Sequence, residues 1–260
     1  AIGSEHRDAH WMNAQSEGFD VQIDNVTESL GAVLITGPKS RQILQLMTTE
    51  DLSNDAFSWL RMKEIKIDSA RVRVIRVSYA GELGYELHMP SYQLLSIYDS
   101  MCRVGGDYGL RDFGGYAFNS LRMEKAYRGW GAELTGEISL VEAGMDRFYN
   151  LNKKSNFIGS EVLRDKIQSG VDIKIVYLEV DVDKADARGN EPVYHKNKIV
   201  GVVTSGAFGF RVNKSLAFAY VNSDLAKVGT ELHIEIQGQK RKAKILNSPA
   251  YDPENKKLKS

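Results

Sequence analysis

Residues 78–86, SYAGELGYE, contain two glycines, two tyrosines and two glutamates within nine positions. Glycine permits the backbone conformations that tight turns need, so Gly81 and Gly84 predict a sharp reversal of the chain. Such a reversal aims Tyr79 and Glu86 from two strands into one cavity. The spacing alone favours the simpler alternative, a hairpin whose acidic side chains are exposed to solvent.

The segments on either side of this stretch alternate apolar and polar residues as β-strands do. Strands are predicted over 65–78 and 85–89, as a hairpin or a tight strand pair. Further upstream, alternation at 19–23 and an apolar run at 32–35 predict two more strands. A helix is predicted to begin at Pro38, because proline suits the first turn of a helix.

Helical spacing and then short β-rich runs follow along the chain. Helices are predicted from Ser91 to Gly105-Gly106, over 116–127 and over 159–168. Six β-rich runs then predict a small antiparallel barrel, at 173–180, 191–195, 198–204, 215–221, 230–237 and 240–246. The sequence therefore predicts an α+β fold with a C-terminal antiparallel β-barrel domain, divided into residues 1–158 and 159–260.

The composition is that of a globular protein. The 260 residues include 34 Lys or Arg, 34 Asp or Glu and one Cys, and the formal net charge is zero. Balanced charge predicts neither a nucleic-acid nor a membrane partner, and no apolar run reaches the roughly 18 residues that span a bilayer. Cys102 lies in an apolar helical pattern, which predicts a buried thiol in a reducing compartment, either cytoplasmic or the mitochondrial matrix. Because the sequence begins with Ala1 rather than Met, we expect a processed product or a fragment.

Several common cofactor and catalytic motifs are absent from the sequence. It has no G-x-G-x-x-G after a strand, no P-loop, no G-x-S-x-G elbow, no C-x-x-C and no H-E-x-x-H. Rossmann dinucleotide binding, nucleotide hydrolysis and the common hydrolase, redox and zinc sites are therefore not predicted. His6 and His10 have the spacing of two metal ligands on a helix, but no third ligand is suitably placed, so no metal site is predicted.

Ordered blocks of sequence resemble those of one known family. Besides SYAGELGYE, the chain contains TGP at 36–38, LRME at 121–124, EAG at 142–144, FIGSE at 157–161, GVVTSG at 201–206 and KSLA at 214–217. The set resembles the folate-binding aminomethyltransferase family, which includes the glycine cleavage T-protein. It is most similar to the C-terminal tetrahydrofolate-binding halves of dimethylglycine and sarcosine dehydrogenases. The resemblance spans residues 20–250 and implies the family's folate-binding fold with its C-terminal barrel.

The resemblance implies four folate-binding residues. The pterin ring of tetrahydrofolate presents an amino group and a ring N–H side by side, and Glu86 occupies the family position whose carboxylate accepts both. Tyr79 matches the tyrosine that lines the pterin site. Tyr127 is a second candidate pocket aromatic, with a core tyrosine as an equally supported alternative. Arg122 is the fourth candidate, but a cation within an apolar helix should pair with an acid or carbonyl in any case, so a structural role comes first.

Residues 121–133, LRMEKAYRGWGAE, indicate the subfamily. In T-proteins an arginine that contacts folate stands three residues before the leucine of this segment, whereas this chain has Phe118 there. The EKAYRGWG form instead resembles the dimethylglycine and sarcosine dehydrogenases. The family's acid that assists chemistry at folate N10 lies upstream of the segments seen here, so no catalytic residue is assigned. FAD is expected only if an upstream flavin domain exists.

The function that the resemblance implies is tetrahydrofolate-dependent one-carbon transfer. Formaldehyde, or an iminium from N-demethylation of a dimethylglycine- or sarcosine-like amine, is captured to give 5,10-methylenetetrahydrofolate. The expected partners are folate, a small methylated amine or formaldehyde, and an upstream flavin domain if one exists. Two alternatives stay open, a non-catalytic folate-binding scaffold and a structural or assembly role. The non-catalytic scaffolds of the family, which assist iron–sulfur proteins, carry a K-G-C-[FY]-x-G-Q-E motif. The first alternative is disfavoured because the corresponding residues here, 154–161, read KSNFIGSE and lack the cysteine.

Overall fold

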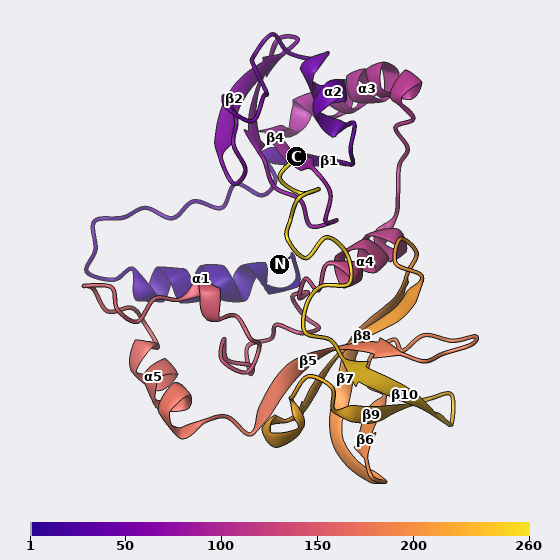
Figure 1. Ribbon diagram of the computed structural model, residues 1–260. Coiled ribbons are helices and arrows are strands. Elements are labelled where there is room, and N and C mark those ends of the chain that lie inside the picture. The colour runs from indigo at the N-terminus through magenta and orange to yellow at the C-terminus, as the bar shows by residue number, and fades with distance from the viewer. Residues whose placement is uncertain (1) are drawn as a thin grey trace. The chain divides into compact units, whose positions relative to one another are not determined.

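The computed structural model describes residues 2–260, which form two compact units (Figure 1). The first unit comprises Ala1–Ser78, Glu82–Asp112 and Lys257–Ser260, and the second comprises Tyr79–Gly81 and Phe113–Lys256. Short 3-10 helices occur at Ile2–Ser4, Ser91–Gln93, Gly106–Tyr108, Asp146–Phe148 and Ser223–Leu225. No helix of the described part of the chain is long and apolar enough to cross a membrane.

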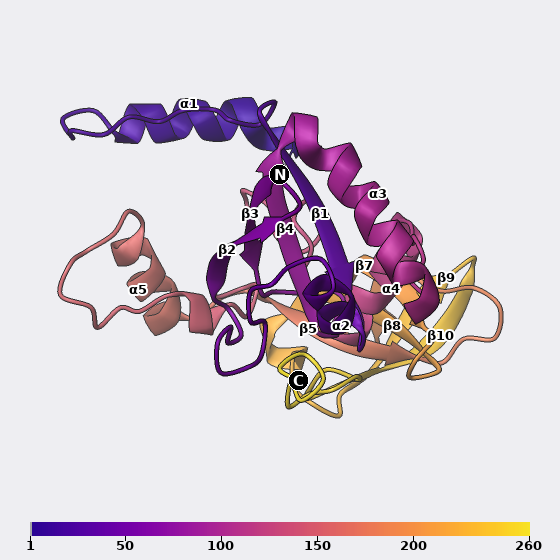
Figure 2. The same cartoon turned by 90° about the horizontal axis from the view of Figure 1, so that it is seen from above.

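The first unit is built on a four-stranded antiparallel sheet. Its strands are β1 (Leu30–Thr36), β2 (Met62–Ile67), β3 (Ala70–Ile75) and β4 (Gly84–Pro90), in the order β1-β4-β3-β2. Helices α2 (Ser40–Gln45) and α3 (Leu94–Gly105) share a hydrophobic cluster with one face of this sheet, and Figure 2 shows α3 running along it beside β1. The period of two along β4 therefore buries Tyr85, Leu87 and Met89 and leaves Glu86 and His88 on the other face.

The predicted strand at 19–23 is wrong. Helix α1 (Glu5–Gln15) is followed by a loop, and Phe19, Val21 and Ile23 are exposed within it. Alternation of side chains supports a strand only when a neighbouring strand accepts and donates its backbone hydrogen bonds. No strand among residues 2–260 pairs with this segment, so the segment forms a loop in spite of its alternating side chains.

The predicted burial of Cys102 is also wrong, because its side chain is exposed. The helix itself is present as α3, with Ile97 and Met101 buried. Successive residues on a helix are separated by about 100° around its axis, so Cys102 is rotated away from the stripe that contains Met101. Apolar spacing of three and four residues did not distinguish which of these two neighbours faces the core.

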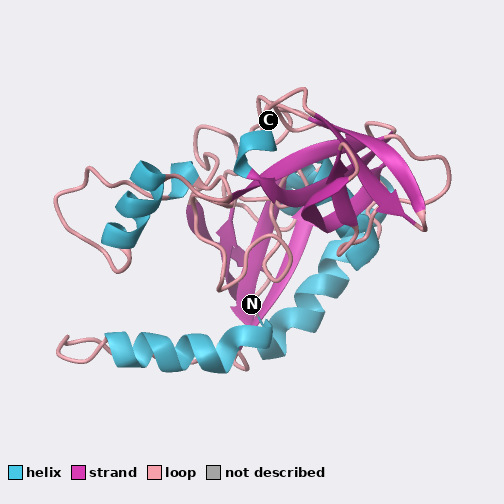
Figure 3. Ribbon diagram, turned by 90° about the horizontal axis from the view of Figure 1, so that it is seen from below, coloured by secondary structure: helices cyan, strands magenta, loops and turns pink. Residues whose placement is uncertain are grey.

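The second unit contains the predicted six-stranded barrel, which is confirmed. Strands β5 (Ile173–Val180), β6 (Pro192–His195), β7 (Lys198–Gly209), β8 (Lys214–Asn222), β9 (Glu231–Ile236) and β10 (Gln239–Ile245) close in the order β10-β5-β8-β7-β6-β9. All neighbouring pairs are antiparallel, and Figure 3 shows them as curved magenta ribbons. Helix α5 (Ser160–Ser169) precedes the barrel in sequence.

Helix α4 (Gly115–Glu124) belongs to the same unit as the barrel. Its Met123 is fully buried in a cluster with Tyr177, Leu216 and Phe218 of the barrel strands. The hydroxyl of Ser120 donates to the carbonyl of Phe208 on β7, at 2.6 Å. The end of α4 is thereby held against the barrel, and the candidate binding residues Arg122 and Tyr127 lie here and in the loop that follows.

Candidate functional site

Of the two glycines in residues 78–86, Gly81 has the turn conformation that the sequence predicts, and Gly84 is required for a different reason, a close approach of neighbouring atoms. Gly81 has a φ of 77°, a left-handed conformation that other residues adopt only at a cost. A Cβ on Gly84 would lie 2.8 Å from the Cβ of Ser78 and 3.1 Å from the carbonyl oxygen of Ile35. Only glycine fits at this close approach, which occurs just where β4 begins.

Glu86 lies on β4 in the first unit, on the sheet face opposite the helices. In register it faces Leu34 on β1 and Ile75 on β3, so its cross-strand neighbours are apolar. Its side chain is 40% exposed, and its Oε2 is 3.5 Å from Nε2 of His88, two residues along the same face. The carboxylate is therefore accessible and is approached by one potential cation within its own strand.

Aromatic side chains gather around Tyr79 in the second unit. Its ring stacks on that of Tyr127, with centroids 5.3 Å apart and planes at 25°. The Tyr79 ring also contacts the ring of Phe118, with centroids 5.5 Å apart. The Phe118 ring in turn contacts that of Phe113, with centroids 6.2 Å apart. Burial raises the pKa of both Tyr79 and Tyr127, so both phenols stay protonated near neutral pH. We call these four rings the aromatic row.

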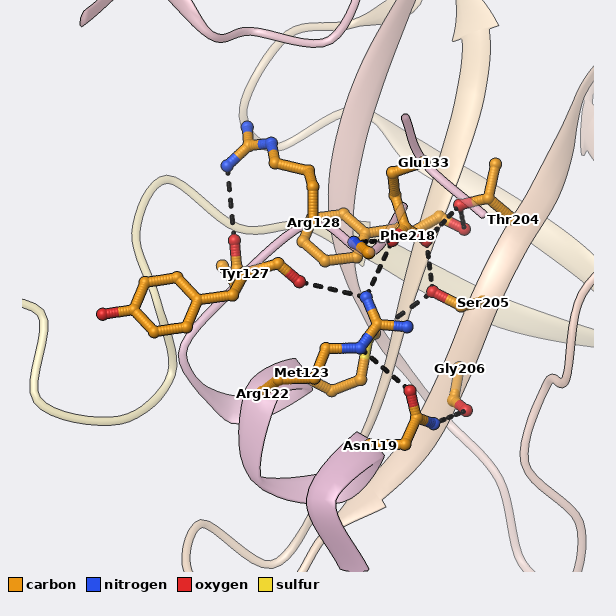
Figure 4. Close-up of polar contacts among 12 residues, drawn as sticks. Asn119, Arg122, Met123, Tyr127, Arg128, Glu133, Thr204, Ser205, Gly206 and Phe218 are labelled. Carbon is orange, nitrogen blue, oxygen red and sulfur yellow. Dashed lines mark hydrogen bonds and ion pairs between the residues drawn. The ribbon is translucent and has the colours of Figure 1, made fainter. Parts of the chain in front are cut away.

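A buried ion pair lies beneath the segment that carries Tyr127 (Figure 4). Arg122 Nη1 donates to Glu133 Oε2 at 2.8 Å, and the two side chains are 7% and 0% exposed. The same carboxylate accepts from the backbone N–H of Gly129 at 2.7 Å and from the hydroxyl of Thr204 at 2.7 Å. Ser205 donates a further hydrogen bond to it. Its oxygens thus accept hydrogen bonds from α4, from the loop and from β7.

The guanidinium of Arg122 also donates to one backbone carbonyl and to one side-chain amide. It donates through Nη1 to the carbonyl of Tyr127 at 3.0 Å and through Nε to Oδ1 of Asn119 at 2.9 Å. The phenol of Tyr79 donates to the carbonyl of Arg128, the residue that follows Tyr127. The expectation that Arg122 pairs with an acid or carbonyl is confirmed, and through these bonds it orients the segment bearing Tyr127.

Arg128 is held by a separate set of contacts. Its Nε donates to the carbonyl of Ala143 at 3.1 Å, and its guanidinium lies over the ring of Phe218, 5.7 Å from the centroid. Burial lowers its pKa, although a guanidinium remains charged at any physiological pH. Arg128 therefore anchors the loop to the barrel rather than pointing its charge at solvent.

The structure brings Tyr79, Tyr127 and Arg122 together within one unit, whereas Glu86 belongs to the other unit.

Glu133 was missed as a site residue by sequence reasoning. The available signal was the unmatched charge of Arg122 in an apolar helix, which required an acid, and Glu133 ends the same segment, 121–133. Among the described residues, no group of three or more His, Cys, Asp or Glu side chains is arranged to hold a metal ion.

Comparison with known proteins identifies related sequences along nearly the whole chain. Residues 1–153 match the model of the GCVT N-terminal domain, and residues 174–252 match the glycine cleavage T-protein C-terminal barrel domain. The chain is 39% identical over 249 residues to mitochondrial dimethylglycine dehydrogenase of Homo sapiens, covering 95% of this chain and 29% of that protein. It is 33% identical over 245 residues to an aminomethyltransferase of Desulfitobacterium hafniense, covering 94% of this chain and 66% of that protein.

A solved structure shares the fold. The aminomethyltransferase T of the glycine cleavage system from Bartonella henselae aligns with a TM-score of 0.86 at 22% identity, covering 96% of this chain and 67% of that chain. At this identity the likeness speaks for the fold alone. The chain thus spans less than a third of the dehydrogenase relatives and about two thirds of the aminomethyltransferases.

Proposed function

Because the chain belongs to the aminomethyltransferase family of the glycine cleavage T-protein, we propose that it binds tetrahydrofolate and uses it in one-carbon transfer. The one-carbon donor is formaldehyde, or an iminium from N-demethylation of a dimethylglycine- or sarcosine-like amine. Two folate nitrogens, N5 and N10, each form a bond to the carbon of this unit, and the oxygen of formaldehyde leaves as water or the nitrogen of the iminium leaves as the amine, giving 5,10-methylenetetrahydrofolate. Part of the support is the 39% identity to a dimethylglycine dehydrogenase over 95% of the chain.

The observation that carries the proposal is the placement of Glu86. Its carboxylate is 40% exposed, and the residue pairs in register with the apolar Leu34 and Ile75, on the sheet face opposite the helices. A carboxylate offers two oxygens side by side, which matches the paired amino and ring N–H donors of a pterin edge. The donor set of the ligand and the acceptor set of the residue therefore fit.

Aromatic side chains of the second unit are suited to contact a pterin ring. Tyr79 and Tyr127 are already stacked at 5.3 Å, which leaves no space for a third ring between them. A pterin therefore lies against an outer surface of the aromatic row, where stacking contributes about 0.5–1.5 kcal/mol beyond area burial. The pair of Arg122 and Glu133 keeps that surface in place by holding the carbonyl of Tyr127.

The parent protein and its location are proposals that rest on the relatives. We assign residues 1–158 to the folate-binding region and residues 159–260 to the barrel domain, which the family-model limits at 153 and 174 support. Two demethylating relatives are mitochondrial, which supports the mitochondrial matrix as the site of action, with the cytoplasm as the alternative. In a dehydrogenase parent, FAD occupies a separate upstream domain.

Calorimetric titration of the chain with tetrahydrofolate, under anaerobic conditions, tests the proposal. Wild type binds, and Glu86→Gln weakens binding by about 1.5–3 kcal/mol, because one charge-assisted acceptor is lost. The matched control is Glu64→Gln on β2, whose acid pairs with exposed Arg71 at 3.3 Å and leaves affinity unchanged. Absence of binding by wild type, or equal affinities of wild type and Glu86→Gln, would contradict the proposal.

A further inference from the structure

Two arginines of the first unit hold residue 260. Nη2 of Arg41 on α2 donates to the carbonyl oxygen of Ser260 at 2.8 Å, and Nη2 of Arg76 donates to the same oxygen at 2.9 Å. Arg76 Nη2 also donates to the carbonyl of Lys259 at 3.0 Å. All four residues belong to the first unit. Two guanidiniums therefore converge on one oxygen of the segment Lys257–Ser260, which we call the tail.

Neighbouring groups hold the tail and the arginines in place. Leu258 is 3% exposed, and Nζ of Lys259 lies over the ring of Trp59, 4.9 Å from its centroid. Nε of Arg41 donates to the phenol oxygen of Tyr85, a buried residue of β4, at 3.1 Å. The site is thus a defined arrangement of donors from separate elements of the first unit.

No acidic side chain balances the positive charge of this site. The other acceptors are neutral, because Arg76 donates to the carbonyl of Phe57 at 2.7 Å and Arg41 donates to Oδ1 of Asn54 at 2.7 Å. Among the residues that the structure describes, neither arginine forms an ion pair with an Asp or Glu. Burial lowers the pKa of Arg76, which is 1% exposed, and the charge of Arg41 lowers it further. A buried cation is costly without a counter-charge, so an anion is expected here.

We propose that Arg41 and Arg76 form a carboxylate-binding site, and that a carboxylate on residue 260 of the tail is its ligand. Arginine presents a planar fork of donors that matches the two oxygens of a carboxylate. Hydrogen bonds between ionised partners are also about twice as strong as those between neutral ones. The negative charge then lies where the two guanidiniums already meet. A small free carboxylate is the other source of the same chemistry.

Trypsin cleavage after Lys257 measures how often the tail leaves the site, because cleavage of a folded protein requires local opening. The 260-residue chain is compared with the same chain extended by Gly-Ser-Gly, in which residue 260 presents a neutral carbonyl. Losing a charge-assisted hydrogen bond is expected to speed cleavage about tenfold or more. Arg41→Gln is expected to speed cleavage similarly in the 260-residue chain and less in the extended chain. The extension changes no residue of the site, so its result does not depend on a variant that folds poorly.

Acetate, compared with chloride at the same ionic strength, distinguishes the two sources of the carboxylate. If the tail supplies it, acetate leaves the melting temperature of the 260-residue chain unchanged. If a free carboxylate is the ligand, acetate raises the melting temperature of both chains but not that of Arg41→Gln, and the extension leaves cleavage unchanged. That second result would retain the site and overturn the tail as its ligand.

The matched control is Arg71→Gln, which removes an exposed arginine of the same unit that pairs with Glu64 at 3.3 Å. It is expected to leave tail cleavage at the wild-type rate. Acceleration by Arg71→Gln equal to that by Arg41→Gln would overturn the inference, because it would reflect general loosening of the unit. Wild-type cleavage of both the extended chain and Arg41→Gln, with no effect of acetate, would overturn the site altogether.

Discussion

Glu133 fixes the segment that presents Tyr127. Its buried carboxylate accepts from Arg122, from the Gly129 amide and from two hydroxyls of β7. Its own carbonyl accepts from the phenol of Tyr220 at 2.8 Å. A buried ion pair is weak evidence for stability by itself, but removing one partner leaves the other charge buried and unpaired. The pair therefore links α4, the loop and β7 through a single carboxylate.

We expect Glu133→Gln to lower the free energy of unfolding by about 3–5 kcal/mol, since Arg122 keeps its charge in a nearly dry environment. Urea denaturation followed by circular dichroism measures this loss. Glu64→Gln, which breaks an exposed pair with Arg71, is the control and should cost no more than about 1 kcal/mol. A Glu133→Gln variant as stable as that control would show that the buried charge is compensated elsewhere.

At the scale of secondary-structure elements, the C-terminal end of α4 is held by further ion pairs. Buried Glu124 pairs with Arg211, and buried Lys125 pairs with Asp252 at 3.3 Å between Nζ and Oδ2. Helix α4 ends at Glu124, and two residues later Ala126 has a φ of 54°. Left-handed backbone is unfavourable for alanine by about 1–2 kcal/mol, so the end of this helix is strained.

Ala126→Gly is expected to stabilise the protein by about 0.5–1 kcal/mol, because glycine removes the left-handed strain at a smaller cost in chain entropy. Thermal and urea unfolding measure the change. Ala117→Gly, within α4 itself, is the matched control and should destabilise by roughly 0.5–1 kcal/mol through lost helix propensity. Destabilisation by both substitutions to the same extent would mean that Ala126 is not strained.

The sequence predicted the barrel well, because turn residues mark the limits of each strand and the alternation is strong. The six runs at 173–246 correspond to β5–β10 with shifts of a few residues, apart from the extension of β7 to Gly209. Predictions that depended on partners distant in sequence were less successful. The segment 19–23 has no pairing strand among the described residues. Which acid pairs with Arg122 could not be predicted from residue spacing, because it depends on how the loop up to Glu133 folds back.

At the scale of the whole molecule, the chain passes between the two units more than once. Residues 79–81 belong to the second unit, whereas Ser78 and 82–86 belong to the first. The chain returns to the first unit at its last residues, where Leu258 is buried and Arg76 donates to the carbonyl of Ser260 at 2.9 Å. The SYAGELGYE stretch thus contributes Tyr79 to one unit and Glu86 to the other, which spacing alone did not predict.

In the proposed complex, Glu86 accepts hydrogen bonds from the amino edge of a reduced folate. The most direct measurement is a cycle of four affinities, for wild type and Glu86→Gln, each with tetrahydrofolate and with its analogue lacking the 2-amino group. If the two groups touch, each change alone weakens binding by about tenfold or more, and both together weaken it much less than the product of the separate effects. Losses that multiply in full would show that Glu86 and the amino group act independently, and would contradict the account.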